Sequence, residues 1–505
     1  MSDLSLKKLK SGSDIRGVAI EGIPGEPVTL TDEAIDAIGY GFVAWLSERT
    51  SPAKGNRFNV AIGHDSRITA DRVKNRLIPV LTDCGIDVKD CGLATTPAMF
   101  MTTVDFDCDA AIEITASHHP WNRNGLKFFL KSGGIESSDV AAILELGEEG
   151  IRLSAKDKGT VTETPYMNTY AETLRNLICE KVNSDDYARP LRGFHIVVDA
   201  GNGAGGFYAS RVLEPLGADI SGSQFLEPDG MFPNHVPNPE DKTAMASVSA
   251  AVLEHNADLG IIFDTDGDRA ACVGRDGREI NRNALIALAS CIALEDNDGG
   301  TIVTDSVTSS GLKTFIEETL GGQHRRFKRG YRNVINEAKR LNLEELVNAP
   351  LAIETSGHAA MRDNYFLDDG AYLSTRILIK AALLAREGKT VGDLIADLKE
   401  PKESAEYRLS ILDPEFAAAG QKVIDDLTAW ADQNGDYVLA DDSAEGVRAT
   451  KTPADGWFLL RLSVHDPVLP LNIESNLEGG VTDILNDLKA FFRTYHTLDA
   501  SCLEE

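Results

Sequence analysis

Three aspartates stand two residues apart in DLGIIFDTDGDRAACV, where an apolar segment runs directly into Asp264, Asp266 and Asp268. Carboxylates at this spacing on a glycine-containing turn can converge on a hard cation such as Mg²⁺. An EF-hand loop is excluded, because Arg269 and Arg275 stand where that loop has its glycine and its final glutamate. The structural alternative is a solvated acidic turn, but a cation would relieve the mutual repulsion of the carboxylates. The pattern therefore favours a metal site.

A serine that could act as a nucleophile lies in AAIEITASHHPWNRNGLKFF. A predicted strand ends at Ile114 and places Ser117 in a tight turn with His118 and Pro120. A hydroxyl needs a base or an electrophile beside it to act as a nucleophile, and Lys127 could return to the same site. Taken alone, Ser117 is more simply explained as a turn or helix-capping serine.

A third polar segment, LAIETSGHAA, follows another short apolar stretch and contains Glu354, Ser356 and His358. Glutamate and histidine around a Ser-Gly pair suit hydrogen bonding to a polyhydroxylated ligand, although a simple polar turn explains these residues equally well. The Pro/Asn-rich segment PDGMFPNHVPNPE is long enough to be a functional loop.

Composition excludes several classes of partner. The 505 residues include 50 Lys+Arg and 79 Asp+Glu, a formal net charge of -29, so we expect neither nucleic-acid nor anionic-membrane binding. The seven cysteines form no Cys-x-x-Cys pair, which argues against a zinc site and a disulfide framework. No run of 18 apolar residues is present, and we expect a cytoplasmic protein.

The elements that must position these side chains alternate between strand and helix. The first third predicts a helix after Thr31, a strand at 58–62, a helix from Ala70 to Gly85 and a strand at 110–114. The order strand, Asp, small residues, helix occurs twice, at 194–217 and at 301–322. This rhythm indicates mostly parallel sheets.

After a predicted linker, KEPKES at 399–404, the pattern changes to a compact α+β module. It predicts a strand at 407–412, a helix at 414–430, strands near 437–439 and 456–462, and a final amphipathic helix. We therefore expect three similar mixed α/β domains followed by a smaller α+β C-terminal domain. The predicted boundaries are 1–160, 161–285, 286–398 and 399–505.

Together the three chemical segments resemble those of the α-D-phosphohexomutases, a family that includes phosphoglucomutases and phosphomannomutases. TASHHP, DTDGDR and ETSGH occur in the family's order, and the resemblance runs from about Ser11 to Glu474. Further matching segments are SGSDIRG, GHDSR, VVDAGNGAG, PDGMFPNHVPNPE and GYRNV.

The resemblance implies a phosphoserine mechanism in a central cleft between four domains. Ser117 would be phosphorylated, and its phosphate would bind Mg²⁺ together with Asp264, Asp266 and Asp268. Residues matching the family's acid–base or electrostatic groups are Arg16, Lys127 and His358, with Arg269 beside the phosphoryl group. Those expected to bind substrate are Arg332, Glu354 and Ser356. Glucose or mannose 1,6-bisphosphate would be the intermediate and the activator.

One segment, GWFLLRLSVHDPVLPLNIES, departs from the family's pattern. The family usually binds the non-reacting phosphate through Arg-x-Ser-Gly-Thr-Glu-Pro, with a second arginine three residues after the proline. Arg461, Ser463 and Pro467 are kept, and His465 could supply a weaker contact. The differing positions are Val464, His465, Asp466 and Pro470, the last standing where the second arginine would be. Because that arginine is well shaped for bidentate phosphate contact, we expect altered phosphate affinity or substrate choice.

The preferred hypothesis is a phosphohexomutase acting on glucose or mannose phosphates, as a monomer or homodimer. A phosphatase of the haloacid-dehalogenase type, with Asp264 as the nucleophile, explains the metal loop but leaves TASHHP and ETSGH unexplained. A non-catalytic regulator that binds sugar phosphates would fit the altered last segment, but it would not need the full set of catalytic residues.

Overall fold

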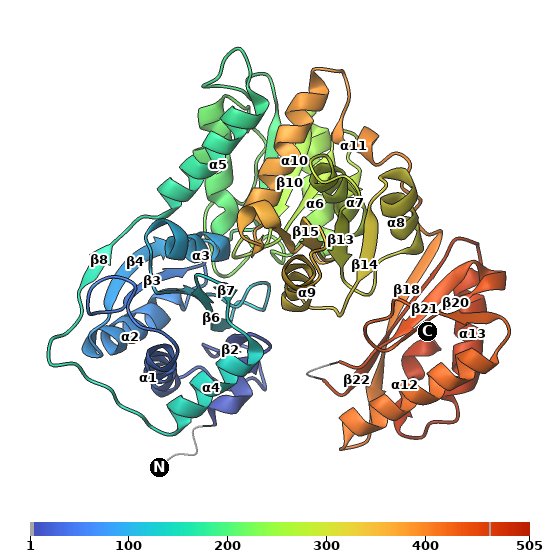
Figure 1. The fold of residues 1–505 in the computed structure, drawn as a ribbon, viewed down its shortest axis with the longest axis horizontal. Helices are drawn as coiled ribbons and strands as arrows, with labels where there is room; N and C mark the ends of the chain where they lie inside the picture. Colours follow the sequence, from blue (N-terminus) through green and yellow to red (C-terminus); the bar gives the residue numbers. More distant parts are fainter. Residues whose placement is uncertain (1–4, 464–465, 505) are drawn as a thin grey trace. The chain divides into compact units, whose positions relative to one another are not determined.

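The computed structural model describes residues 5–463 and 466–504. The chain forms two compact units, and Figure 1 labels its helices and strands. The first runs to Ile292 and also includes Ser356–Leu394, and the second comprises Ala293–Thr355 and the chain from Ile395 onward. Among the described helices, none is long and apolar enough to cross a bilayer.

The first unit begins with a mixed sheet in the order β1-β2-β6-β5-β3-β4-β8, with β7 pairing to β6. Its strands are β1 (Lys10–Ser11), β2 (Asp14–Val18), β3 (Asn59–His64), β4 (Asp87–Leu93), β5 (Ala110–Ile114), β6 (Arg123–Leu130), β7 (Gly133–Gly134) and β8 (Val161–Glu163). Strands β4 and β5 flank β3 in parallel, while β6 runs antiparallel to β5. Four helices accompany the sheet: α1 (Asp32–Arg49), α2 (Ala70–Asp83), α3 (Thr96–Asp105) and α4 (Ser137–Glu148). The predicted strand at 110–114 is β5, and α2 ends two residues before the predicted Gly85.

Next along the chain, α5 (Met167–Val182) precedes a second sheet in the order β12-β11-β10-β9. Its strands are β9 (Ile196–Asp199), β10 (Leu259–Phe263), β11 (Ala270–Gly274) and β12 (Glu279–Ile280), with α6 (Lys242–His255) packed against β9 and β10. Strands β9 and β10 are parallel, and β11 returns antiparallel to β10. The turn between β10 and β11 therefore holds the three aspartates.

The helix predicted after β9 is not a regular α-helix. Two short 3₁₀ turns flank a π-helical stretch, Tyr208–Leu213. Pro215 has no N–H to donate to the carbonyl of Arg211, and this carbonyl instead accepts a hydrogen bond of 2.5 Å from Arg175 Nη1.

The remaining elements of the first unit follow Ser356. They are the antiparallel pair β16 (Ala359–Met361) and β17 (Leu367–Asp368), then α10 (Gly370–Ala385) and α11 (Val391–Leu394). The hydroxyl of Tyr170, on α5, donates to Asp369, which caps α10, so these two helices are joined by a buried hydrogen bond. Helix α7 (Asn283–Leu294) crosses the boundary between the units.

The second unit contains two sheets. In the first, β13 (Thr301–Thr304) lies between β14 (Gln323–Arg326) and β15 (Leu351–Ile353), and all three strands are parallel. Helix α8 (Ser310–Thr314) continues as a π-helical stretch, Phe315–Thr319, and α9 (Tyr331–Glu344) precedes β15. The predicted order of strand, Asp305, small residues and helix is confirmed here.

The C-terminal sheet has the order β19-β20-β21-β22-β18-β23. Its strands are β18 (Glu403–Ile411), β19 (Tyr437–Leu439), β20 (Val447–Lys451), β21 (Gly456–Leu460), β22 (Val468–Ser475) and β23 (Leu498–Asp499). Helices α12 (Phe416–Gln433) and α13 (Gly480–Phe492) share one apolar core with alternate strand residues such as Leu409, Leu460 and Leu471.

Three sequence predictions need correction in this sheet. Strand β18 begins inside the predicted linker, β21 ends at Leu460, and β20 and β22 are not predicted at all. Pro470 hides β22 from a pattern-based prediction, yet it is tolerated because it lies where the neighbouring β21 ends and few ladder bonds remain to be lost. The chain thus combines three mixed α/β domains with a smaller α+β C-terminal domain, as predicted.

Candidate active site

Ser117 lies in a buried turn just after β5, in the left-handed backbone region with φ of +51°. Its backbone N–H donates to Thr115 Oγ1 at 2.8 Å, and Thr115 Oγ1 in turn donates to Asp65 at 2.6 Å. A non-glycine residue in this region costs about 1–2 kcal/mol and persists only where its surroundings enforce it. The turn is therefore held in a fixed shape that presents the hydroxyl.

Arg67 provides most of that enforcement, although the sequence analysis assigned it no role. Its buried guanidinium donates to the backbone carbonyls of four residues in and after the turn: Ser117, His119 (2.6 Å), Pro120 (2.8 Å) and Arg123 (2.9 Å). Its Nε lies 3.3 Å from Asp65 Oδ2. The segment GHDSR, known from the sequence only as a match to the family, thus supports the serine turn.

The Ser117 hydroxyl lies among three polar groups. It donates to Asp264 Oδ2 at 3.1 Å, accepts from Arg269 Nη2 at 3.4 Å, and lies 3.3 Å from His118 Nδ1. Arg269 also donates through Nε to Asp264 at 3.0 Å and is buried. The predicted nucleophile, metal loop and following arginine are therefore in direct contact.

The three aspartates fit a divalent cation. All are buried, and one carboxylate oxygen of each lies within 4.8 Å of those of the other two. Asp266 Oδ1 and Asp268 Oδ1 have no hydrogen-bond partner among the described residues, so each keeps an oxygen that a cation could bind. An all-oxygen donor set is the one that Mg²⁺ prefers.

Lys127 lies beside the same carboxylates. Its Nζ donates to Asp266 at 2.8 Å and to Asp268 at 2.5 Å, while Thr96 Oγ1 at the start of α3 donates to Asp266 at 2.5 Å. Burial would raise the pKa of Asp266, but Lys127 and Thr96 more than offset this and lower it. Burial and the neighbouring carboxylates raise the pKa of Asp264 well above its usual value, and a bound cation would oppose that shift.

His358 is held close to the metal loop. It forms an isolated antiparallel bridge with Arg269, and its Nδ1 lies 3.9 Å from Asp268 and in hydrogen-bond contact with Asp368. Burial alone would lower the pKa of His358, but Asp368 and Asp268 raise it to about 9. The imidazole is therefore cationic at neutral pH. Asp368 was missed by the sequence analysis, and its only signal is its place ten residues after a predicted site histidine.

Two further histidines of the serine turn are neutral. Burial, followed by the charge of Arg269, lowers the pKa of His118 to about 2, and burial with Arg16 lowers that of His119 to about 3. Arg16 itself lies on β2, where its Nη2 donates to Asp14 at 2.8 Å. The first unit therefore combines a serine, three carboxylates and several fixed cations.

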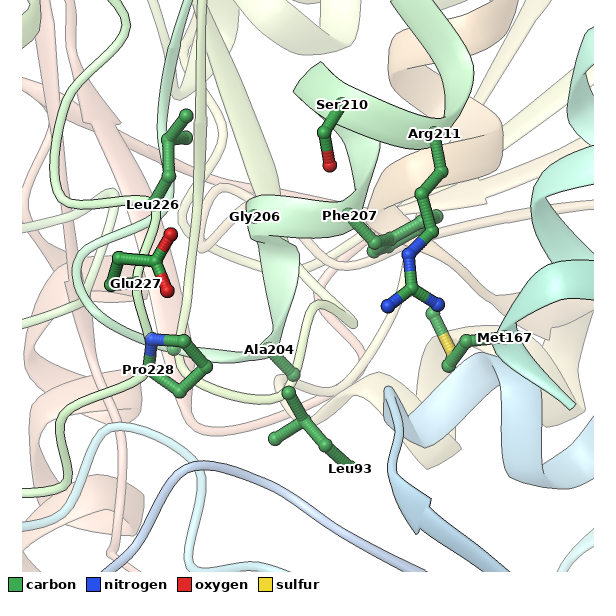
Figure 2. Close-up of a pocket in the computed structure, with 11 residues that line it drawn as sticks. Leu93, Met167, Ala204, Gly206, Phe207, Ser210, Arg211, Leu226, Glu227 and Pro228 are labelled. Carbon is green, nitrogen blue, oxygen red and sulfur yellow. The ribbon is translucent and has the colours of Figure 1, made fainter. Parts of the chain in front are cut away.

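The glycine-rich segment after β9, residues 201–206, packs against the metal loop. Ala204 N donates to the Thr265 carbonyl at 2.8 Å, and a β-carbon on Gly203 would lie only 2.5 Å from that same oxygen. Close backbone packing thus requires glycine here. A cavity of about 240 Å³ lies beside this segment, lined by Phe207, Arg211 and Glu227 among others, and none of the predicted site residues lines it (Figure 2).

The remaining predicted residues, Ser356 excepted, lie in the second unit. Glu354 is buried, and its Oε1 accepts from Gly330 N at 2.6 Å; Arg332 lies in the first turn of α9. Arg461 and Ser463 follow β21, and His465 lies outside the described residues. ETSGH crosses the boundary, since Ser356 and His358 belong to the first unit.

Comparison with known proteins identifies the class. The family descriptions "Phosphoglucomutase/phosphomannomutase, alpha/beta/alpha domain" I, II and III match residues 7–152, 168–277 and 281–401. A phosphomannomutase/phosphoglucomutase of Pseudomonas syringae is 31% identical over 92% of this chain and 91% of its own, and a Neisseria gonorrhoeae phosphoglucomutase is 29% identical over 93% and 95%. The crystal structure of a family protein from Burkholderia thailandensis superimposes with a TM-score of 0.79 at 26% identity, covering 97% of each chain.

The fold and these matches are those of a phosphohexomutase. The chain belongs to the phosphoglucomutase/phosphomannomutase family. Neither the phosphatase hypothesis nor the non-catalytic regulator is supported by these matches.

Proposed function

We propose that this enzyme interconverts the 1-phosphates and 6-phosphates of glucose, mannose or both through a phosphoserine at Ser117. The observation that carries the proposal is the contact of the Ser117 hydroxyl with Asp264 at 3.1 Å and with Arg269 at 3.4 Å. A serine fixed between a carboxylate cluster and a guanidinium suits phosphoryl transfer, in which the protein mainly positions the reactants and neutralises charge.

Asp264, Asp266 and Asp268 would hold Mg²⁺ together with the Ser117 phosphate, and the ion would neutralise charge that develops on the transferring group. A sugar hydroxyl attacks phosphorus, the bond from phosphorus to Ser117 Oγ breaks, and a bisphosphorylated sugar forms. The attacking hydroxyl loses a proton and Ser117 Oγ gains one. Lys127, whose Nζ donates to Asp266 and Asp268, would give its proton to Ser117 Oγ and take up that of the hydroxyl. Arg269 and the cationic His358 stabilise the negative charge. Transfer of the other phosphate back to Ser117 completes the cycle.

The other predicted residues act on the bound sugar phosphate. Glu354 and Ser356 would accept hydrogen bonds from sugar hydroxyls, while Arg332, Arg461, Ser463 and His465 would contact phosphate. Arg16 would add positive charge beside the phosphoserine. Glucose or mannose 1,6-bisphosphate would activate the enzyme by phosphorylating Ser117. The same proposal includes the predicted domain boundaries, the central cleft, a monomeric or dimeric state and a cytoplasmic location.

Mass spectrometry of the intact protein and its peptides tests the mechanism. We expect one phosphate on Ser117, either as purified or after incubation with glucose 1,6-bisphosphate, and its loss on addition of hexose 1-phosphate with Mg²⁺. The Ser117→Ala variant should show neither phosphate nor turnover. A base-labile phosphate on Asp264 would instead support the phosphatase mechanism, and a chain that stays unmodified and inactive would contradict the proposal.

Substrate choice is measured separately, by comparing kcat/KM for glucose 1-phosphate and mannose 1-phosphate in the same preparation. Turnover of either sugar agrees with the proposal. Phosphorylated Ser117 without turnover of either would place the substrate outside these two hexoses.

A further inference from the structure

Pro470, which stands at the position of the expected second arginine, lies in the middle of a paired strand. Its partner on β18 is Arg408, and on the other side its carbonyl accepts from the backbone N–H of Arg461 at 3.1 Å. The three residues therefore form one row across β18, β22 and the end of β21.

The side chains of this row share one face of the sheet. Leu409, Leu471 and Leu460, each adjacent to a member of the row, point into the core beneath α12 and α13. Because successive side chains of a strand alternate between faces, Arg408, Pro470 and Arg461 point to the opposite face. Two strand spacings separate the two arginines by about 10 Å, with only the small proline ring between them.

Both arginines are placed to bind an anion. Arg461 is partly buried, and its Nε has no hydrogen-bond partner among the described residues. Burial, followed by the charge of Arg329, lowers the pKa of Arg461. The neighbouring carboxylates therefore do not fully offset the cost of burying its positive charge. The Arg408 side chain is 57% exposed, and its ion pair with Asp466 is long, at 4.0 Å. An exposed pair of this length contributes little and leaves the guanidinium available to a ligand.

Two acidic side chains, Glu406 and Glu445, lie near Arg461, but both form hydrogen bonds with other groups. Glu406, two residues before Arg408 on the same face, accepts from Asn472 Nδ2 at 3.2 Å. Glu445 accepts from Arg329 N at 2.9 Å and from Ser306 Oγ at 2.5 Å. Both carboxylates thus have other partners.

We infer that Arg408 and Arg461 together bind the phosphate group of the substrate that does not react, so that Arg408 on β18 supplies the guanidinium missing at position 470. The ligand is a phosphate monoester dianion, which two guanidinium groups can grip through several charge-assisted hydrogen bonds. The inference rests on the proposed function for the identity of the substrate.

Substitution of Arg408 tests the inference in the full-length enzyme. Arg408→Ala should raise KM for glucose 1-phosphate about tenfold, the effect of losing one charged hydrogen bond, with a smaller change in kcat. Arg408→Lys should give an intermediate KM, because it keeps the charge but loses the planar fork. Arg493→Ala is the matched control, since Arg493 is an exposed arginine at the end of α13 and lies on the helix-covered side of the same sheet.

Direct binding separates this inference from the proposed function. Calorimetry with glucose 6-phosphate, in the Ser117→Ala background, should show about tenfold weaker binding for Arg408→Ala and no change for Arg493→Ala. The role of Arg408 would be overturned if Arg408→Ala had the same KM and Kd as Arg493→Ala, whether both variants matched the wild type or both bound more weakly. A wild-type enzyme that binds the sugar phosphate through Arg408 but shows no turnover and no phosphoserine would refute the proposed function while supporting the inference.

Discussion

At the scale of single residues, the chemistry depends on groups held rigidly by buried partners. Ser117 adopts a left-handed conformation, and the hydroxyl reaches Asp264 and Arg269 only because the turn is fixed in that shape. Arg67 supplies four hydrogen bonds to the turn from a fully buried position. Such a residue contacts no reacting atom but sets where the reacting atoms lie.

Replacing Arg67 by lysine should therefore damage both stability and catalysis. The ammonium group cannot reach all four carbonyls, and buried carbonyls left without a donor should cost about 2–4 kcal/mol of unfolding free energy. We also expect a fall in kcat of about tenfold or more, because the serine turn loses its fixed geometry. Urea unfolding and steady-state kinetics measure the two effects.

The control for this prediction is Arg76→Lys, which changes an exposed arginine paired with Asp36. An exposed ion pair contributes at most about 1 kcal/mol, so this variant should remain close to wild type. Equal stability and kcat for both variants would show that the turn does not depend on Arg67.

At the scale of elements, the loop 228–240 connects the second sheet to Arg269. His235 Nε2 lies 3.0 Å from Asp199 at the end of β9, and its Nδ1 lies 2.9 Å from the Val236 carbonyl. Burial would lower the pKa of His235, but the contact with Asp199 raises it, which favours a cationic anchor. Further along the loop, Asn238 Oδ1 accepts from Arg269 Nη1 at 3.0 Å.

Asn238 should therefore position Arg269 beside Ser117. We expect Asn238→Ala to lower kcat about tenfold with little change in KM, because the lost contact orients a group that acts on the transferring phosphate rather than on sugar binding. Asn234→Ala is the comparison, since Asn234 lies in the same loop but donates to Asn202 instead. A rise in KM with unchanged kcat for Asn238→Ala would assign the loop to substrate binding.

At the scale of the whole molecule, the predicted site residues are distributed over both units of the chain. The serine, the three aspartates, Lys127 and His358 belong to the first unit, whereas Glu354 and Arg461 belong to the second. Three buried carboxylates with two unpartnered oxygens leave the first unit less stable without a cation than with one.

Mg²⁺ should accordingly stabilise the first unit. At a concentration of about 100 times its Kd, a bound ion adds about 2.7 kcal/mol to the stability of the state that binds it. Hydrogen–deuterium exchange should show added protection within residues 1–292 and little change beyond 395, and a chelator should remove both the protection and the activity. Asp266→Asn should abolish the response, while Asp276→Asn, in the exposed turn after β11, should keep it. Protection spread evenly over both units would contradict a localised metal site.

Much of this site could be predicted from the sequence because its chemistry is concentrated in short segments. The segment DTDGDR places three carboxylates on one turn, independently of distant parts of the chain. The apolar segment at 110–114 followed by TASHHP predicts a serine at the end of a strand. The same local patterns predicted α1, β5, β9 and the unit of β13, Asp305 and α8, since hydrophobic periodicity acts over neighbouring residues. They did not predict the π-helical stretch after β9. Strand β20 was not predicted because it is short and has only two apolar residues, Val447 and Ala449, and β22 was not predicted because it contains Pro470.

The sequence by itself determined which residue types are available for phosphoryl transfer and in what order along the chain. Only the tertiary structure decided that Arg67 supports the serine turn from 50 residues away, that Asp368 keeps His358 cationic, and that Arg408 lies beside Pro470. The physical reason is that hydrogen bonds, buried ion pairs and strand register join residues that are distant in the chain, whereas propensity and periodicity report only on neighbours.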